Sequence, residues 1–82
     1  MKIERVVTVF DNKTERLIKE INVDYIDVEQ LKKIFNVPGD DPMMYKVYEI
    51  TPGHVQTVNE LLRNTIVFDL GKNAYYFECS QL

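Results

Sequence analysis

Hydrophobic and polar positions change their period several times along the chain, and each change marks a predicted element. Residues 6–10 are all β-branched or aromatic within a predicted strand over Ile3–Phe10, and alternating apolar residues return, after a polar turn, over Arg16–Val23. Two such runs separated by turn-forming residues predict a β-hairpin. Side chains alternate along a strand, so Leu17 and Ile21 are expected on one face of the second strand and Ile18 on the other.

Two later stretches have the pattern of amphipathic helices. The first is expected to begin at Asp27 as its N-cap and to end at Asn36 in a left-handed conformation, just before a proline. The second is expected to begin with Thr51 as its cap and Pro52 at its first helical position, and to end at Asn64. The apolar stripes are Val28, Leu31, Ile34 and Phe35 in the first helix, and Val55, Val58, Leu61 and Leu62 in the second.

The remaining apolar runs predict three more strands. Met43–Ile50 has apolar residues on both alternating faces, which indicates an interior strand. Ile66–Leu70 and Ala74–Cys79 flank a glycine-containing turn and predict a second hairpin. The order ββαβαββ predicts a single α+β domain over residues 1–82, with a mainly antiparallel sheet and both helices packed on one face. The other face is then partly open, and at least one aromatic of Tyr75–Phe77 should line it.

Charge narrows the classes of partner. The net charge is −3, and acidic residues outnumber basic ones most clearly between Asp24 and Glu49. Nucleic-acid binding needs clustered Lys and Arg to neutralise phosphates, so direct nucleic-acid binding is not expected. The same acidity suits a basic protein partner, and it also suits plain solubility.

The compartment follows from the cysteine count and from the start of the chain. Cys79 is the single cysteine, which excludes an internal disulfide and fits a reducing compartment. The first twenty residues are dense in charge and hold no long apolar run. We therefore expect neither a signal peptide nor a membrane span, and a cytoplasmic location.

The loop from Pro38 to Pro42 has two interpretations. Two prolines bracket one glycine and two carboxylates, which suits an ordered connection between a helix and a strand. Alternatively, the stiff loop presents Asp40 and Asp41 to a cationic partner. On charge and presentation, the expected partner-binding residues are Asp24, Asp27, Asp40, Asp41 and Tyr45.

Catalytic chemistry is not indicated by the residues present. Nucleophilic or acid–base catalysis needs a donor, a base and an orienting partner. The chain has one histidine (His54), one cysteine (Cys79) and one serine (Ser80), in no recognised spacing. His54 is expected to be exposed or to cap the second helix, and Cys79 to be a small core residue. We expect no catalytic residue, no metal site and no cofactor, and therefore not an enzyme.

Several motifs along the chain resemble those of one family. They are Val9-Phe10-Asp11-Asn12-Lys13-Thr14-Glu15, Ile34-Phe35-Asn36-Val37-Pro38, Asp40-Asp41-Pro42-Met43, Tyr48-Glu49-Ile50-Thr51 and Tyr75-Tyr76-Phe77-Glu78-Cys79. Together they resemble a family of small bacterial domains of unknown function that includes proteins similar to immunity proteins of contact-dependent growth inhibition. The likeness covers almost the whole chain, but its motifs are structural, so it implies a class of protein and no binding residues.

The resemblance implies a protein that acts by occupancy. An immunity protein of this kind binds its cognate toxin in the cytoplasm and covers the active site or an adjacent exosite. Such toxins are often nucleases with basic clefts, which an acidic, tyrosine-bearing inhibitor would complement. The alternative is a non-catalytic housekeeping interaction module or subunit. Such a module would also use the tyrosines for contact, namely Tyr45, Tyr48, Tyr75 and Tyr76.

Overall fold

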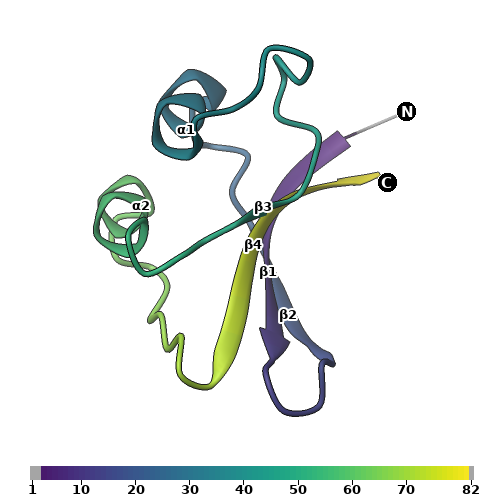
Figure 1. Cartoon of the computed structure of the whole chain (residues 1–82), viewed down its shortest axis with the longest axis vertical. Coiled ribbons are helices and arrows are strands. Elements are labelled where there is room, and N and C mark those ends of the chain that lie inside the picture. Colours follow the sequence, from purple (N-terminus) through teal and green to yellow (C-terminus); the bar gives the residue numbers. More distant parts are fainter. Residues whose placement is uncertain (1–2, 82) are drawn as a thin grey trace.

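The fold is a four-stranded antiparallel sheet with two helices against one of its faces (Figure 1). The computed structural model describes residues 3–81. Its elements are β1 (Ile3–Asp11), β2 (Leu17–Asn22), α1 (Val28–Phe35), β3 (Tyr48–Glu49), α2 (Val55–Leu61) and β4 (Asn73–Gln81). The α+β class, the antiparallel sheet and the placement of both helices on one face are confirmed. Neither of these helices is long and apolar enough to cross a membrane.

The strand order β2-β1-β4-β3 places the two long strands at the centre of the sheet. β1 and β4 pair along their whole length, from Ile3 opposite Gln81 to Asp11 opposite Asn73. Because successive side chains of a strand point to opposite faces, the odd-numbered residues of these two strands share one face and the even-numbered residues the other. The helices cover the odd-numbered face, and no helix that the structure describes packs against the even-numbered face, which we call the open face.

The core lies between the odd-numbered face and the helices. Val7 and Val9 of β1 are almost completely buried there, beside Phe77 of β4. Leu31 of α1 and Val58 of α2 close the core from the helix side, as their apolar stripes predicted. Each such side chain stabilises the fold by roughly 1.5–3 kcal/mol relative to exposure, which makes this contact the main source of stability.

The ends of α1 are as the sequence predicts, but the start of α2 is not. The Asp27 carboxylate caps α1 by accepting a 3.0 Å hydrogen bond from the Glu29 amide, and Asn36 ends it in the left-handed conformation. The second helix begins at Val55 rather than directly after Thr51. In the intervening turn the His54 ring accepts a 3.1 Å hydrogen bond from the Thr51 amide through Nδ1, so His54 takes part in the helix start.

The predicted interior strand over Met43–Ile50 is wrong in length and position. Only Tyr48–Glu49 forms a strand, and it lies at the edge of the sheet, paired with β4 alone. The preceding residues turn instead, because the Asp41 carboxylate accepts hydrogen bonds from the backbone amides of Tyr45 and Lys46. Those amides are therefore not free to pair with a strand.

The predicted strand over Ile66–Leu70 does not form, so the second hairpin is absent as well. The Tyr75 hydroxyl accepts a 2.9 Å hydrogen bond from the Asp69 amide and donates a 3.3 Å hydrogen bond to the Val67 carbonyl. A side chain thus bonds the backbone groups that a neighbouring strand would otherwise bond. The segment runs as irregular chain with Ile66 buried in the core.

A β-bulge changes the expected faces of β2. Val9 pairs with Lys19 but Phe10 pairs with Leu17, so Ile18 is the extra residue. The bulge reverses the alternation at this point. Leu17 therefore lies opposite Phe10, while Ile21, opposite Val7, packs against the core. The expectation that Leu17 and Ile21 share one face is wrong for this reason.

Candidate functional site

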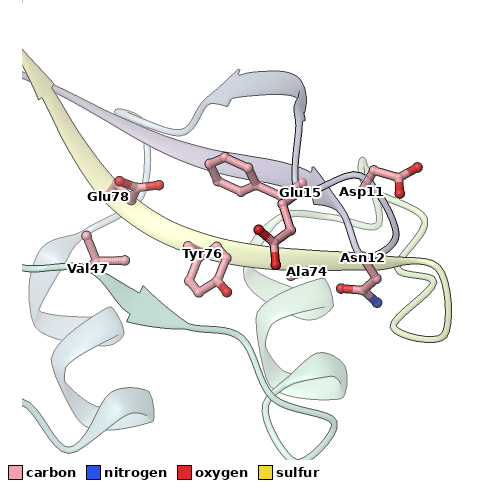
Figure 2. Close-up of a pocket in the computed structure, with 8 residues that line it drawn as sticks. Asp11, Asn12, Glu15, Val47, Ala74, Tyr76 and Glu78 are labelled. Atoms are coloured by element: carbon pink, nitrogen blue, oxygen red, sulfur yellow. The ribbon is translucent and has the colours of Figure 1, made fainter.

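The open face of the sheet is hollowed by a groove of about 470 Å³ next to the β1–β2 turn (Figure 2). Strands β1 and β4 form its floor, the turn forms one wall, and Val47 before β3 lies on the opposite side. The lining residues are Phe10, Asp11, Asn12, Glu15, Val47, Ala74, Tyr76 and Glu78. No lysine or arginine is among them.

Carboxylates gather on the open face because of the strand register. Glu4 of β1 and Glu78 of β4 are even-numbered residues of the central strands, and Glu20 of β2 pairs with Thr8 of the same face. Glu49 of β3 pairs with Tyr76, so it also belongs to this face. Among the strand residues that the structure describes, every lysine and arginine (Arg5 and Lys19) belongs to the other face. The open face therefore has a negative potential that nothing within its strands neutralises.

Glu78 is positioned by a hydrogen bond on the floor of the groove. The Thr8 hydroxyl donates to its carboxylate across the two central strands. Thr8 is almost fully buried, whereas Glu78 keeps partial exposure. The bond therefore fixes the direction of the carboxylate while leaving acceptor sites open to the groove.

Glu15 is positioned by the hairpin turn. Its φ of 60° places it in the left-handed region, where a residue with a Cβ is strained. A 2.8 Å hydrogen bond from its amide to the Asp11 carbonyl holds this conformation. Figure 2 shows the Glu15 side chain directed across Ala74 into the groove. The turn therefore holds a second carboxylate over the floor.

Asp11 has a structural part in the same turn. Its carboxylate accepts hydrogen bonds of 3.0 Å from the Thr14 amide and 2.7 Å from the Lys13 amide. These bonds, that of Thr14 first, lower the pKa of Asp11, because they favour the charged form. In Figure 2 the carboxylate of Asp11 points away from the groove. Asp11 thus shapes the turn, and Glu15 and Glu78 supply the groove's charge.

Tyr76 supplies the aromatic wall. It lies on the open face between Ala74 and Glu78, and its ring meets that of Phe10 edge to face, with centroids 5.8 Å apart. The adjacent aromatics Tyr75 and Phe77 are buried in the core. The expectation that at least one of these three aromatics lines the open face is confirmed.

Asp41 is not presented to solvent as the sequence suggested. Its side chain is 5% exposed and accepts a 2.5 Å hydrogen bond from the Tyr48 hydroxyl, besides the two from the backbone amides of Tyr45 and Lys46. The Tyr48 bond, followed by those of the amides, lowers the pKa of Asp41. Burial, and then the nearby Asp41, raises the pKa of Tyr48 to about 12. The pair orders the loop from the inside, so the interpretation of Asp41 as a presented contact is wrong.

The other four predicted contact residues are exposed but lie outside the groove. Asp40 forms a 3.1 Å ion pair with Lys46, and Tyr45 is 51% exposed in the same loop. Asp24 accepts a 2.7 Å hydrogen bond from the Arg5 amide, and Asp27 is the N-cap of α1. The guanidinium of Arg5 also donates a 2.7 Å hydrogen bond to the Met43 carbonyl. Arg5 therefore links the segment around Asp24 to the loop before β3. Partner binding by these four stays a prediction.

His54 and Cys79 each contact a backbone group of a neighbouring turn or loop. The His54 ring lies 4.5 Å, centroid to centroid, from that of Phe35 and bonds the α2 turn. The Cys79 thiol is 3.6 Å from the Met44 carbonyl, and burial raises its pKa. A raised pKa leaves less of the reactive thiolate. Among the residues described, no three His, Cys, Asp or Glu side chains are placed to hold a metal ion.

Sequence reasoning did not identify the groove residues Glu15, Val47, Tyr76 and Glu78 as a site. A pattern that could have indicated them is the alternation in β4, where apolar Tyr75 and Phe77 are interleaved with Ala74, Tyr76 and Glu78. The position of Glu15 has no comparable pattern, because its direction depends on a left-handed turn residue.

The comparisons with known proteins support one family. A family model described as "Domain of unknown function (DUF7683)" matches residues 4–78. No curated protein and no solved structure gives a significant match. The matched residues include all the described strands and helices except the first residue of β1 and the last residues of β4. This chain therefore belongs to the DUF7683 family of domains of unknown function.

Proposed function

We propose that this protein is an immunity protein that binds and neutralises a cognate bacterial toxin domain in the cytoplasm. The toxin is a basic protein, of which a nuclease with a phosphate-binding cleft is the leading example. The immunity protein occludes the active site or an adjacent exosite and breaks no bond itself.

The observation that supports this proposal most strongly is the acidic open face. Glu4, Glu20, Glu49 and Glu78 share it with Tyr76, and no lysine or arginine lies at its described strand positions. A basic cleft that attracts phosphates also attracts a surface of fixed carboxylates. Tyrosine adds a large contact area with few rotatable bonds, which is why it is frequent at protein interfaces.

The test is titration calorimetry of the purified protein against the toxin domain encoded next to its gene. We expect saturable binding with a dissociation constant well below micromolar, and loss of toxin activity at one equivalent. We also expect the association rate to fall as salt rises, because screening weakens the attraction between the two surfaces. Absence of binding at micromolar concentration would reject the proposal.

A pair of matched charge reversals locates the surface. Glu20→Lys changes the open face, whereas Glu60→Lys makes the same change in net charge at an exposed position of α2. We expect Glu20→Lys to slow association roughly tenfold and Glu60→Lys to change it little. Equal effects of the two reversals would mean that net charge alone matters and that the open face is not the contact.

The predicted contacts outside the groove are tested in the same assay. Asp40→Lys and Tyr45→Ala alter exposed residues of the loop before β3. If they weaken toxin binding while Glu20→Lys does not, the toxin binds at this loop rather than on the open face. A housekeeping interaction module would bind no neighbouring toxin in any of these experiments.

A further inference from the structure

We propose that the groove on the open face is an anchor pocket for one arginine side chain of a partner protein. The guanidinium would lie between the carboxylates of Glu15 and Glu78, against the ring of Tyr76. The identity of the partner as a basic toxin rests on the proposed function, but the chemistry of the pocket does not.

The negative charge of the groove favours binding of a cation. Glu15 and Glu78 approach it from different elements, the hairpin turn and β4 (Figure 2). Within the described part of the chain, no ion pair involves either carboxylate. An arginine would supply the missing positive charge and could donate to both carboxylates, because its planar fork has five N–H donors.

The apolar part of the groove suits a cationic side chain whose charged group follows several methylene groups. Ala74 and Val47 offer apolar surface, and Val47 is 57% exposed although it lies beside the sheet. The methylene groups of arginine bury well along such a surface while the charged end reaches polar groups. The ring of Tyr76 adds a site for cation–π stacking, which arginine uses more often than lysine.

The size of the groove fits one side chain better than an extended segment. Its volume of about 470 Å³ lies toward the small end of the usual range for ligand pockets. The β1–β2 turn closes one side through Glu15 and Asn12. A pocket of this kind on a charged face is where a dominant interface residue is expected, and arginine is enriched among such residues.

The experiment uses nuclear magnetic resonance on the full-length, ¹⁵N-labelled protein. The probe is N-acetyl-arginine methylamide, and the neutral control is the citrulline analogue, which has nearly the same shape. We expect saturable shifts of amides around Glu15, Ala74 and Tyr76, with a dissociation constant of the order of 10 mM, as small single-residue ligands give. Citrulline should bind at least about fivefold more weakly, and the lysine analogue should fall between them.

Matched variants test the assigned residues. Glu15→Gln and Tyr76→Leu should each weaken the arginine probe about three- to tenfold. Glu60→Gln removes one charge from an exposed position of α2 outside the groove and should change the affinity by less than about twofold. The spectrum of each variant shows whether it is folded. Glu15→Gln changes an exposed side chain, so at least one variant can be compared in the intact fold.

Three results would overturn the proposal: no saturable shift up to about 50 mM probe, equal binding of citrulline and arginine, or equal weakening by Glu60→Gln and Glu15→Gln. These results are separable from the proposed function. Toxin binding that survives Glu15→Gln and Tyr76→Leu would leave the immunity function standing and reject the pocket as its anchor. Probe binding without toxin binding would support the arginine pocket and reject the immunity function.

Discussion

At the residue scale, Asp41 determines the shape of the loop before β3. Its carboxylate accepts hydrogen bonds from two backbone amides and from the Tyr48 hydroxyl, and it is almost fully buried. Its neighbour Asp40 points to solvent and pairs with Lys46. The sequence shows two adjacent aspartates with nothing to distinguish them, so the inward position of one of them was not predictable from pattern alone.

Matched substitutions separate the two aspartates. Asp41→Asn should lower the melting temperature by about 5 °C or more, because an amide has one acceptor oxygen and leaves at least one buried partner without its bond. Asp40→Asn should change it by no more than about 2 °C, as expected for an exposed ion pair. Thermal denaturation followed by circular dichroism measures both. Similar losses for the two variants would contradict the structural role given to Asp41.

The pKa of Tyr48 gives a prediction at high pH. Because burial and the Asp41 carboxylate raise this pKa from 10.0 to about 12, the neutral phenol stabilises the fold fully below pH 10.0, and the stabilisation is lost as the pH rises toward 12. Ultraviolet titration of phenolate absorbance should show a component that ionises late and coincides with unfolding. Tyr48→Phe should remove that component, whereas Tyr45→Phe should leave it in place.

At the element scale, the β1–β2 hairpin forms part of the sheet and also one wall of the proposed pocket. The hairpin was predictable, because two β-branched runs flank a turn rich in Asp and Asn. The bulge between Val9 and Phe10 and the left-handed conformation of Glu15 were not. The first reverses the faces of β2, and the second directs a carboxylate over the sheet.

The strain at Glu15 can be measured. Glu15→Gly should raise the free energy of unfolding by roughly 0.5–1 kcal/mol, because glycine adopts the left-handed region without a Cβ clash. Lys13→Gly, in the same turn but without a positive φ, should lower it by a similar amount through the greater entropy of the unfolded chain. Urea denaturation of the two variants gives both values. A loss of stability in Glu15→Gly would mean that the side chain, and not the backbone, holds the turn.

The less regular elements show where sequence patterns fail. Both α1 and the central strands followed from capping residues and alternation. The stretches Met43–Ile50 and Ile66–Leu70 have equally apolar patterns, yet most of their residues lie outside strands. In each case a polar side chain four to eight residues away, Asp41 for the first stretch and Tyr75 for the second, bonds backbone groups that pairing would need. Such bonds become apparent only once the fold is known.

At the scale of the whole molecule, charge is separated across the sheet as well as along the chain. The first twenty residues are nearly balanced in charge, which conceals that Glu4 and Glu20 lie on the open face while Arg5 and Lys19 lie on the other. The fold class was predictable from the order of the elements. The acidic face was not, because it depends on the register of strands that are distant in sequence. The proposed function and the proposed pocket both rest on this separation.

The position of β2 at the outside of the sheet has a consequence for solubility. An outer strand carries unpaired backbone groups that can recruit a second molecule and start a fibril. Here the bulge at Ile18 interrupts the regular edge, and the opposite charges of Lys19 and Glu20 follow directly after it. Charge and irregularity of this kind are known deterrents to strand addition. Replacing both charges with valine would leave an uncharged, apolar edge, and concentrated samples of that variant would be expected to aggregate.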